Sequence, residues 1–225
     1  MTLAGTLEGA RAMTPLLLGL LVFAMAYGAA AAQKGLSLGE ATLFSGAVFA
    51  GLAQIAALEA WSDHFTAGGL VAIGFVTFAV NLRHVLMAAA LRPWLGPLPA
   101  WQSYPSLLVL ADNNWVLAMR YHSQGGMDGG YLLGAGLASW VIWVGGTLAG
   151  HLIGGGIPDP KVFGLDMVVP AFYIAMLVPS WQGRRHTIAW AVAAAASVTA
   201  AFLLPGWWFI VIGAMAGAIA GGFSD

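Results

Sequence analysis

Long apolar stretches constrain this chain more than any other feature of its sequence. An α-helix needs about 20 mostly apolar residues to cross the hydrocarbon core of a bilayer. Eight apolar runs follow one another, over residues 14–32, 41–60, 65–91, 104–119, 131–152, 162–178, 187–204 and 207–222. We therefore expect an all-α polytopic membrane protein with seven to eight transmembrane or re-entrant helices, organised as one integral membrane domain over residues 1–225.

The composition excludes a water-soluble protein and gives no support to an enzyme. Hydrophobic residues make up 60% of the chain and charged residues 8%, whereas soluble domains carry about 25% charge. The net charge is −1 and no basic cluster is present, so we expect no nucleic-acid partner. The chain has no cysteine, and it lacks a nucleophile elbow, a phosphate loop and a zinc-binding His-Glu helix. We therefore expect no enzyme activity, no metal and no cofactor.

Polar residues interrupt two of the apolar runs. The run over 65–91 is too long for one untilted span, and its residues 81–84 predict a break, a bend or the start of a re-entrant segment. The run over 104–119 is interrupted at residues 112–114. Short helices interrupted by glycine or proline occur in two parts of the chain, 14–91 and 131–222. This is typical of transporters built from two repeats with broken helices.

Arg83 is the most informative charged residue, because an ionised side chain inside hydrocarbon needs a partner or a cavity. Its guanidinium fits a carboxylate, either of a protein aspartate or of an amino-acid ligand. Asn81 lies beside it, and His84 has a side chain that titrates near neutral pH. The structural alternatives are an arginine that snorkels from a helix ending at Val80, and a hydrogen-bonded histidine.

Two aspartates lie inside apolar runs. Asp112 is a natural partner for Arg83 or a proton carrier, but Asp112, Asn113 and Asn114 are also residue types that form a loop between two half-segments. Asp166 either faces a cavity or is a structural acid at a helix N-terminus, stabilised by the helix dipole. His84, Asp112 and Asp166 are therefore the candidates for proton coupling.

A glycine-interrupted segment in the second run is a candidate substrate site. Broken helices expose backbone N–H and C=O groups that bind the charged ends of a zwitterion. The alternative is tight helix packing through small residues. The substrate-binding candidates are Ser45, Gly46, Gly51, Gln54, Asn81 and Arg83.

At these residues the sequence resembles the AzlC family, the large subunit of bacterial branched-chain amino acid exporters (LIV-E type permeases). The resemblance covers nearly the whole chain. Its segments are Pro15–Gly19, Phe44–Gln54, Asn81–His84 (similar to a family Asn-x-Arg-His motif), Leu110–Asp112, Gly164–Asp166 with Pro170, and Leu204 with the Pro-Gly-Trp that follows. One departure is Asn113, where the family usually has glutamate. If that glutamate carries the proton, coupling here rests on Asp112 or Asp166, or is absent.

The resemblance implies a function and a partner. We expect secondary active export of leucine, isoleucine, valine or similar hydrophobic amino acids across the bacterial cytoplasmic (inner) membrane. The export would be coupled to protons, with a small AzlD-type membrane protein as partner subunit. The alternative is a non-transporting membrane scaffold or subunit whose intramembrane polar residues are structural.

Overall fold

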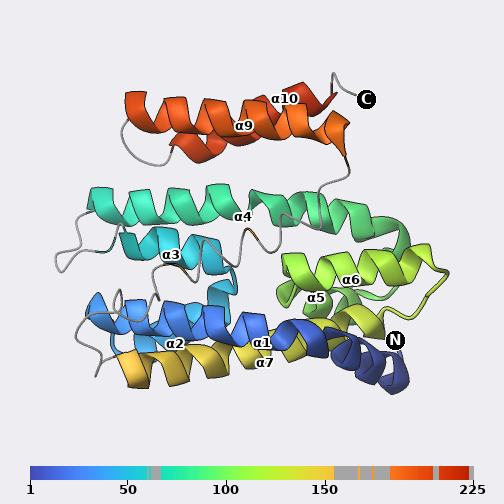
Figure 1. The fold of residues 1–225 in the computed structure, drawn as a ribbon. Coiled ribbons are helices and arrows are strands. Elements are labelled where there is room, and N and C mark those ends of the chain that lie inside the picture. The colour runs from blue at the N-terminus through green and yellow to red at the C-terminus, as the bar shows by residue number, and fades with distance from the viewer. Residues whose placement is uncertain are drawn as a thin grey trace. The chain divides into compact units, whose positions relative to one another are not determined.

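A computed structural model describes residues 1–59, 61, 67–154, 167, 174, 183–204 and 208–222. The chain divides into two compact units, Met1–Val169 and Pro170–Asp225, each of which is described by itself. The first unit contains α1 (Leu3–Gln33), α2 (Leu38–Val48), α3 (Gly51–Glu59), α4 (Ala67–Leu95), α5 (Ala100–Leu108), α6 (Asp112–Ser123) and α7 (Gly130–Gly154), and the second contains α9 (Arg184–Leu203) and α10 (Trp208–Gly222) (Figure 1).

The predicted all-α class is confirmed for the described residues, which form helices and no strand. Three helical segments are long and apolar enough to cross a membrane: Leu3–Gln33, Ile73–Leu95 and Gly130–Gly154. Among the described residues we find nine helices in total, so the expected count of seven to eight is not confirmed. Two apolar runs, 41–60 and 104–119, fold as pairs of short helices rather than as single spans.

α1 and α7 run side by side in the same direction. Gly9 faces Tyr131 near the start of both helices, and Gly28 faces Thr147 towards the end of both. Contacts that advance together along the two chains show that the helices are parallel. The two backbones touch at the glycines: a Cβ atom on Gly150 of α7 would lie 2.0 Å from the Met25 carbonyl oxygen of α1. Small residues at the interface are what allow membrane helices to approach this closely.

α4 runs in the opposite direction to α1 and α7. Its last turn lies where those two helices begin, because the Trp94 indole Nε1 donates a hydrogen bond of 3.1 Å to the Met127 carbonyl just before α7. Near this end, α4 packs against α6 and α7 in an apolar core that includes Leu91, Trp94, Leu110 and Leu132. The first unit therefore combines three long helices in alternating directions along the chain.

A helical hairpin follows each of the first two long helices. α3 folds back along α2. The ring of Phe44, which lies in α2, and the ring of Trp61, which follows α3, are 6.5 Å apart. The base of this hairpin lies where α7 ends, because His151 Nε2 donates to the Leu36 carbonyl at 2.8 Å. α5 and α6 form the second hairpin, which starts beside the end of α4 and turns at residues 109–111 (Figure 1).

The two hairpins enter the first unit from opposite ends and turn inside it (Figure 1). A long helix followed by a hairpin thus occurs twice, over residues 3–59 and 67–123, in opposite directions. This order is similar to that of transporters built from inverted repeats with broken helices. The predicted repeat halves, 14–91 and 131–222, stay a prediction, because much of the second lies outside the described residues.

The second unit is an antiparallel helical hairpin. Gly213 and Gly217 of α10 pack against Ala193 of α9, and the Ser197 hydroxyl donates a 3.1 Å hydrogen bond to the Phe209 carbonyl. A Cβ atom on Gly217 would lie 2.8 Å from the Ala193 Cβ. The glycines of α10 therefore serve contact with α9.

Candidate functional site

The tip of the α5–α6 hairpin brings an acidic side chain to the middle of α4. Asp112 is the first residue of α6, and its Oδ2 lies 2.8 Å from Nη1 of Arg83 on α4. Both side chains are about one-third exposed, at 30% for Arg83 and 32% for Asp112. A carboxylate at a helix N-terminus is stabilised by the helix dipole. The ion pair predicted from the sequence is present, while the roles of both residues in binding or coupling stay predictions.

Arg83 keeps hydrogen-bonding capacity beyond this pair. Its Nε is buried without a hydrogen-bond partner in the described part of the chain, as is Oδ1 of the neighbouring Asn81. A buried polar group without a partner costs about 1–3 kcal/mol. A second acceptor at Arg83, such as the carboxylate of a ligand, would remove this cost and use the fork geometry of the guanidinium.

His84 completes this group, and we call Asn81, Arg83, His84 and Asp112 the arginine cluster. The imidazole Nδ1 lies 3.2 Å from the carbonyl oxygen of Asn81 on its own helix. The ring also lies close to the Asp112 carboxylate and to the Leu110 carbonyl at the hairpin tip. All the ionisable groups of this cluster therefore come from α4 and from the first turn of α6.

Two asparagines shape the hairpin tip. Asn114 is fully buried; its Oδ1 accepts from the Ala111 N–H at 2.9 Å, and its Nδ2 donates to the Val109 carbonyl at 2.7 Å. Asn113 Oδ1 accepts from the Asn114 N–H at 2.8 Å. The chain reverses direction at residues 109–111, before Asp112. Residues 112–114 therefore form the first helical turn of α6, and the Asn114 side chain holds the reversal closed through its bonds to Ala111 and Val109.

Of the break, the bend and the start of a re-entrant segment expected at residues 81–84, the break and the re-entrant start are wrong, and the bend stays a prediction. α4 is one continuous helix over Ala67–Leu95. The polar side chains do not require an interruption because the α5–α6 hairpin supplies a charged partner and its carbonyls from outside the helix. The helix is interrupted instead in the contacting hairpin, between α5 and α6.

The tip of the α2–α3 hairpin holds a different group of polar side chains. Gln54 Nε2 donates to Ser45 Oγ at 3.3 Å, the Ser45 and Thr147 hydroxyl oxygens lie 2.6 Å apart, and Thr147 donates to the Trp143 carbonyl at 2.9 Å. The Trp143 indole in turn donates to Gln54 Oε1 at 3.0 Å. These four residues, which we call the hydroxyl ring, therefore form a closed circuit in which Ser45 donates to Thr147.

The hydroxyl ring is sealed from solvent. Ser45, Gln54 and Thr147 are 0% exposed, and Trp143 is 2% exposed. The Tyr27 hydroxyl lies beside the Gln54 amide, in a geometry that leaves it buried without a hydrogen bond. A closed, fully buried circuit of hydrogen bonds is typical of a structural tie between helices.

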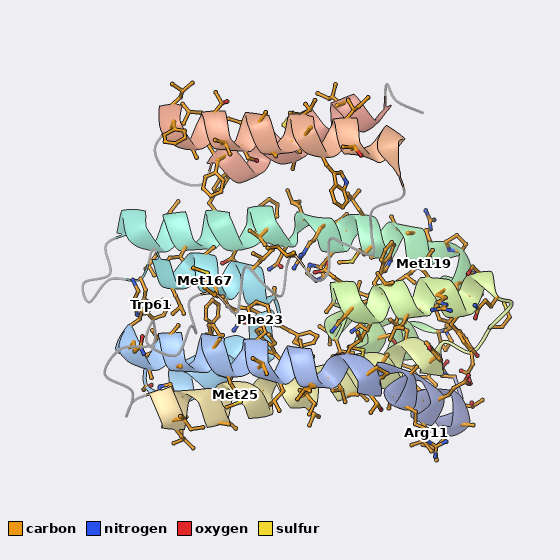
Figure 2. All side chains as sticks on the ribbon, in the orientation of Figure 1. Arg11, Phe23, Met25, Trp61, Met119 and Met167 are labelled. Carbon is orange, nitrogen blue, oxygen red and sulfur yellow. The ribbon has the colours of Figure 1, made fainter. Side chains whose placement is uncertain are left out.

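The two glycines predicted here serve the turn and its packing. Phe49 adopts φ 42°, the left-handed conformation that ends α2, and the Trp140 indole satisfies the freed Gly46 carbonyl at 3.0 Å. A Cβ atom on Gly51 would lie 2.7 Å from the Trp143 ring and 2.9 Å from the Phe23 ring. Figure 2 shows Phe23 pointing from α1 towards α3, into this contact.

The predicted site residues thus fall into two groups. Ser45 and Gln54 lie together in the hydroxyl ring, with Gly46 and Gly51 beside it; Asn81, Arg83, His84 and Asp112 lie together in the arginine cluster. Asp166 lies outside the described residues. Within the described residues, no group of three or more His, Cys, Asp or Glu side chains is placed to hold a metal ion.

Sequence reasoning missed four residues of the α2–α3 tip. Tyr27, Trp140, Trp143 and Thr147 lie on the apolar helices α1 and α7. Single hydroxyl and indole groups inside such helices carry no pattern of their own. A spacing of three and four residues between Trp140, Trp143 and Thr147, which places them on one face of α7, is the signal that was available.

Comparison with known families adds a decisive observation to this geometry. The family model described as AzlC protein matches residues 15–157, which contain most of α1 and all helices from α2 to α7. The chain belongs to the AzlC family. This AzlC match contains both the hydroxyl ring and the arginine cluster, and it ends before the second unit.

Curated relatives of this AzlC chain are membrane proteins. An "Uncharacterized membrane protein" of Archaeoglobus fulgidus is 29% identical over 173 residues, covering 76% of this chain and 74% of the relative. The "Inner membrane protein YgaZ" of Escherichia coli K12 is 28% identical over 191 residues, covering 80% and 74%. No solved structure matches. Together with the three candidate spans, these relatives support a membrane protein.

Proposed function

We propose that this AzlC-family chain is a secondary exporter of leucine, isoleucine, valine or similar hydrophobic amino acids. It would act in the bacterial cytoplasmic membrane, driven by the proton gradient and assisted by a small AzlD-type membrane partner. Family membership and the apolar helices support a transporter-type role. The Escherichia coli relative is named as an inner membrane protein, which supports the inner membrane as the location of this chain.

One observation carries this proposal: the Arg83–Asp112 ion pair at the tip of a re-entrant hairpin. Ionisable residues inside membrane segments are costly and mark substrate or ion pathways. The pair is one-third exposed rather than sealed, and Arg83 Nε is without a partner among the described residues. The exposed part of the pair is therefore accessible to a small polar ligand, and the buried Nε keeps hydrogen-bonding capacity that the described residues do not use.

The chemistry of the pair fits a zwitterion. An α-amino acid carries one carboxylate and one ammonium group, which complement the guanidinium of Arg83 and the carboxylate of Asp112. The bound amino acid replaces one ion pair by two, so no charge is left without a partner. The apolar helices around the site provide the environment that an aliphatic side chain prefers.

The same geometry supplies a way to couple export to protons. The substrate ammonium needs an ionised Asp112, so a proton on Asp112 competes with the amino acid. Proton binding on the outer side would expel the substrate, and proton release on the inner side would allow the next one to bind. Asn113 provides no acid, so we assign this role to Asp112 in the described cluster, while His84 and Asp166 remain further candidates.

The alternative function is a membrane scaffold whose polar residues are structural. The sealed hydroxyl ring favours this interpretation for Ser45 and Gln54, because their polar groups already have partners. A substrate role for Ser45, Gly46, Gly51 and Gln54 would require the α2–α3 tip to open. The scaffold hypothesis predicts changes in stability or partner binding without any change in amino-acid flux.

Efflux of preloaded radiolabelled leucine tests the proposal. The chain is expressed in cells without their own exporters, alone and with an AzlD-type partner, in the presence and absence of a protonophore. We expect efflux that needs the partner and stops with the protonophore. If folded protein is present and a panel of hydrophobic amino acids shows no efflux in any arm, the scaffold alternative replaces the exporter.

A further inference from the structure

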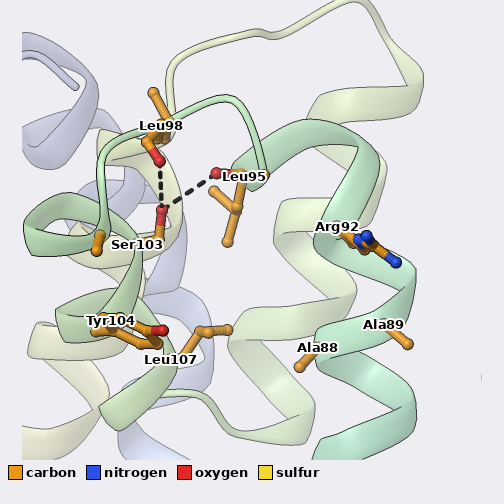
Figure 3. Close-up of a pocket in the computed structure, with 10 residues that line it drawn as sticks. Ala88, Ala89, Arg92, Leu95, Leu98, Ser103, Tyr104 and Leu107 are labelled. Atoms are coloured by element: carbon orange, nitrogen blue, oxygen red, sulfur yellow. Dashed lines mark hydrogen bonds between the residues drawn. The ribbon is translucent and has the colours of Figure 1, made fainter.

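A pocket of about 490 Å³ lies apart from both polar groups, between the last turns of α4 and the first turns of α5. Figure 3 shows Arg92, Ala88 and Ala89 on the α4 side and Ser103, Tyr104 and Leu107 on the α5 side. This volume is in the range of small-ligand sites, about 300–1,000 Å³. Most of the side chains that line it are alanines and leucines.

The charge of the pocket is unbalanced. Among the described residues that line it, Arg92 is the one charged side chain, and no acid is present. The Ser103 hydroxyl is used to tie the turn, since it donates to the Leu95 carbonyl at 3.1 Å (Figure 3). Tyr104 is 66% exposed, so its phenol can meet a ligand at the mouth. The pocket therefore favours an anionic group on an apolar body.

The pocket lies at a level typical of the membrane interface. Arg92 is in the last turn of α4, and the exposed aromatic side chains Trp101 and Tyr104 flank the pocket on α5. Aromatic residues gather where a bilayer meets water, and arginines near helix ends extend towards lipid phosphates. A phosphate is the anionic group present at this level in every phospholipid bilayer.

An exposed apolar stripe leads away from the pocket along α4. Phe78, Leu82 and Val85 are 63%, 48% and 64% exposed, and with Ala89 and Arg92 they repeat every three or four residues on one helix face. From Phe78 to Arg92 the stripe spans about 21 Å at about 1.5 Å per residue. One leaflet of the hydrocarbon core is about 15 Å thick, so the stripe accommodates an acyl chain from headgroup to midplane.

We propose that this pocket binds one anionic phospholipid, of the phosphatidylglycerol type. The phosphate lies on Arg92, the Tyr104 phenol donates to the headgroup, and one acyl chain follows Val85, Leu82 and Phe78. An arginine binds a phosphate through two parallel hydrogen bonds. Phosphatidylethanolamine carries an ammonium group, which meets the positive charge of Arg92 with no acid in the lining to offset it. This inference is independent of the proposed transport function.

Native mass spectrometry of the full chain tests the site. Protein in detergent is mixed with equal amounts of phosphatidylglycerol and phosphatidylethanolamine, and the lipid that stays bound is counted. We expect one retained phosphatidylglycerol and a preference of about tenfold over phosphatidylethanolamine, because the ammonium group of phosphatidylethanolamine meets the charge of Arg92 without an acid in the lining to offset it. Arg92→Gln should remove the preference.

Two variants make the result specific. Arg11→Gln removes an exposed arginine that points away from the bundle (Figure 2) and should leave the preference unchanged. Ala89→Trp fills the pocket without changing charge and should lower phosphatidylglycerol retention, which decides the matter if Arg92→Gln does not fold. Equal retention of the two lipids by the wild-type chain would overturn the site. Full retention of phosphatidylglycerol by folded Arg92→Gln and Ala89→Trp would overturn it as well, because the bound lipid would then be ordinary surrounding lipid.

Discussion

Individual residues carry the chemistry proposed for this AzlC chain. Arg83 and Asp112 were paired from the sequence because each is costly inside an apolar run and each is the natural partner of the other. The structure places them 2.8 Å apart. The roles of Ser45 and Gln54 could not be decided in the same way, because their bonding partners Thr147 and Trp143 lie on the apolar helix α7, more than 80 positions away along the chain.

Asp112→Asn tests proton coupling at the residue scale. Asparagine keeps the size of the side chain but neither holds a proton in exchange nor attracts the substrate ammonium. We expect leucine exchange in proteoliposomes to need about tenfold more substrate, and its dependence on pH to disappear. Glu8→Gln, which removes an exposed acid near the start of α1, is the matched control. A pH dependence that survives in Asp112→Asn would exclude Asp112 as the proton site.

Asp128 tests a second residue-scale expectation, on stability. Its carboxylate accepts hydrogen bonds from the Thr2 hydroxyl and backbone N–H at the start of α1 and from the Gly130 N–H at the start of α7. Partial burial raises the pKa of this carboxyl, but the hydrogen bonds from Thr2 and Gly130 outweigh it and hold the pKa below its ordinary value. The ionised form therefore stabilises the folded state.

The sign of this effect sets its pH range. A lowered pKa contributes stability above the ordinary aspartate value of about 3.9, and the contribution is lost as pH falls through the folded-state value. Asp128→Asn should lower the free energy of unfolding by about 1 kcal/mol at pH 7. The melting temperatures of wild type and variant should converge well below pH 4. A difference that stays constant down to pH 2 would contradict the account.

At the scale of elements, the sequence predicts the two hairpins only in part. Re-entrant and broken helices were expected from the polar interruptions, and the turn before Asp112 lies next to the residues that signalled it. The break expected at residues 81–84 was wrong because a continuous α4 places its polar side chains against the hairpin tip. Sequence pattern alone does not tell which of the two contacting segments is interrupted, since both residues 81–84 and residues 112–114 are polar.

The α1–α7 contact predicts a difference between two glycines of one helix. A Cβ atom on Gly150 would lie 2.0 Å from the Met25 carbonyl oxygen, whereas one on Gly145 meets nothing within 4 Å. Gly150→Ala should therefore destabilise the fold by about 1–3 kcal/mol or more, and Gly145→Ala should be neutral or slightly stabilising. Thermal unfolding in detergent measures both. Equal melting temperatures for the two variants would disprove close backbone packing at Gly150.

The hydroxyl ring predicts a structural phenotype for α7. Thr147→Val removes the acceptor of Ser45 and leaves the buried Ser45 O–H without an acceptor, while Ser45 Oγ still accepts from Gln54. A buried donor without an acceptor costs about 1–3 kcal/mol. Thr42→Val, whose hydroxyl bonds to the Leu38 carbonyl of its own helix, should cost much less. We expect a lower melting temperature for Thr147→Val but unchanged leucine flux per folded molecule. Lost flux at unchanged stability would instead assign the ring to substrate binding.

At the scale of the whole molecule, the chain consists of a family core and an additional helical hairpin. The AzlC match over residues 15–157 lies within the first compact unit, which holds both hairpins and the arginine cluster. The membrane class followed from composition alone. The inverted order of long helix and hairpin did not, because the long helices α1 and α4 are apolar on nearly all faces and carry no periodic signal of direction or contact.

The central claim is that Arg83 binds the carboxylate of the transported amino acid. The most direct measurement is leucine efflux per folded molecule for wild type, Arg83→Gln and the exposed control Arg11→Gln, each expressed with the AzlD-type partner and quantified by folded protein in the membrane. The account predicts that Arg83→Gln abolishes efflux while Arg11→Gln retains it. Full efflux by folded Arg83→Gln would contradict the account and remove the arginine cluster from the substrate path.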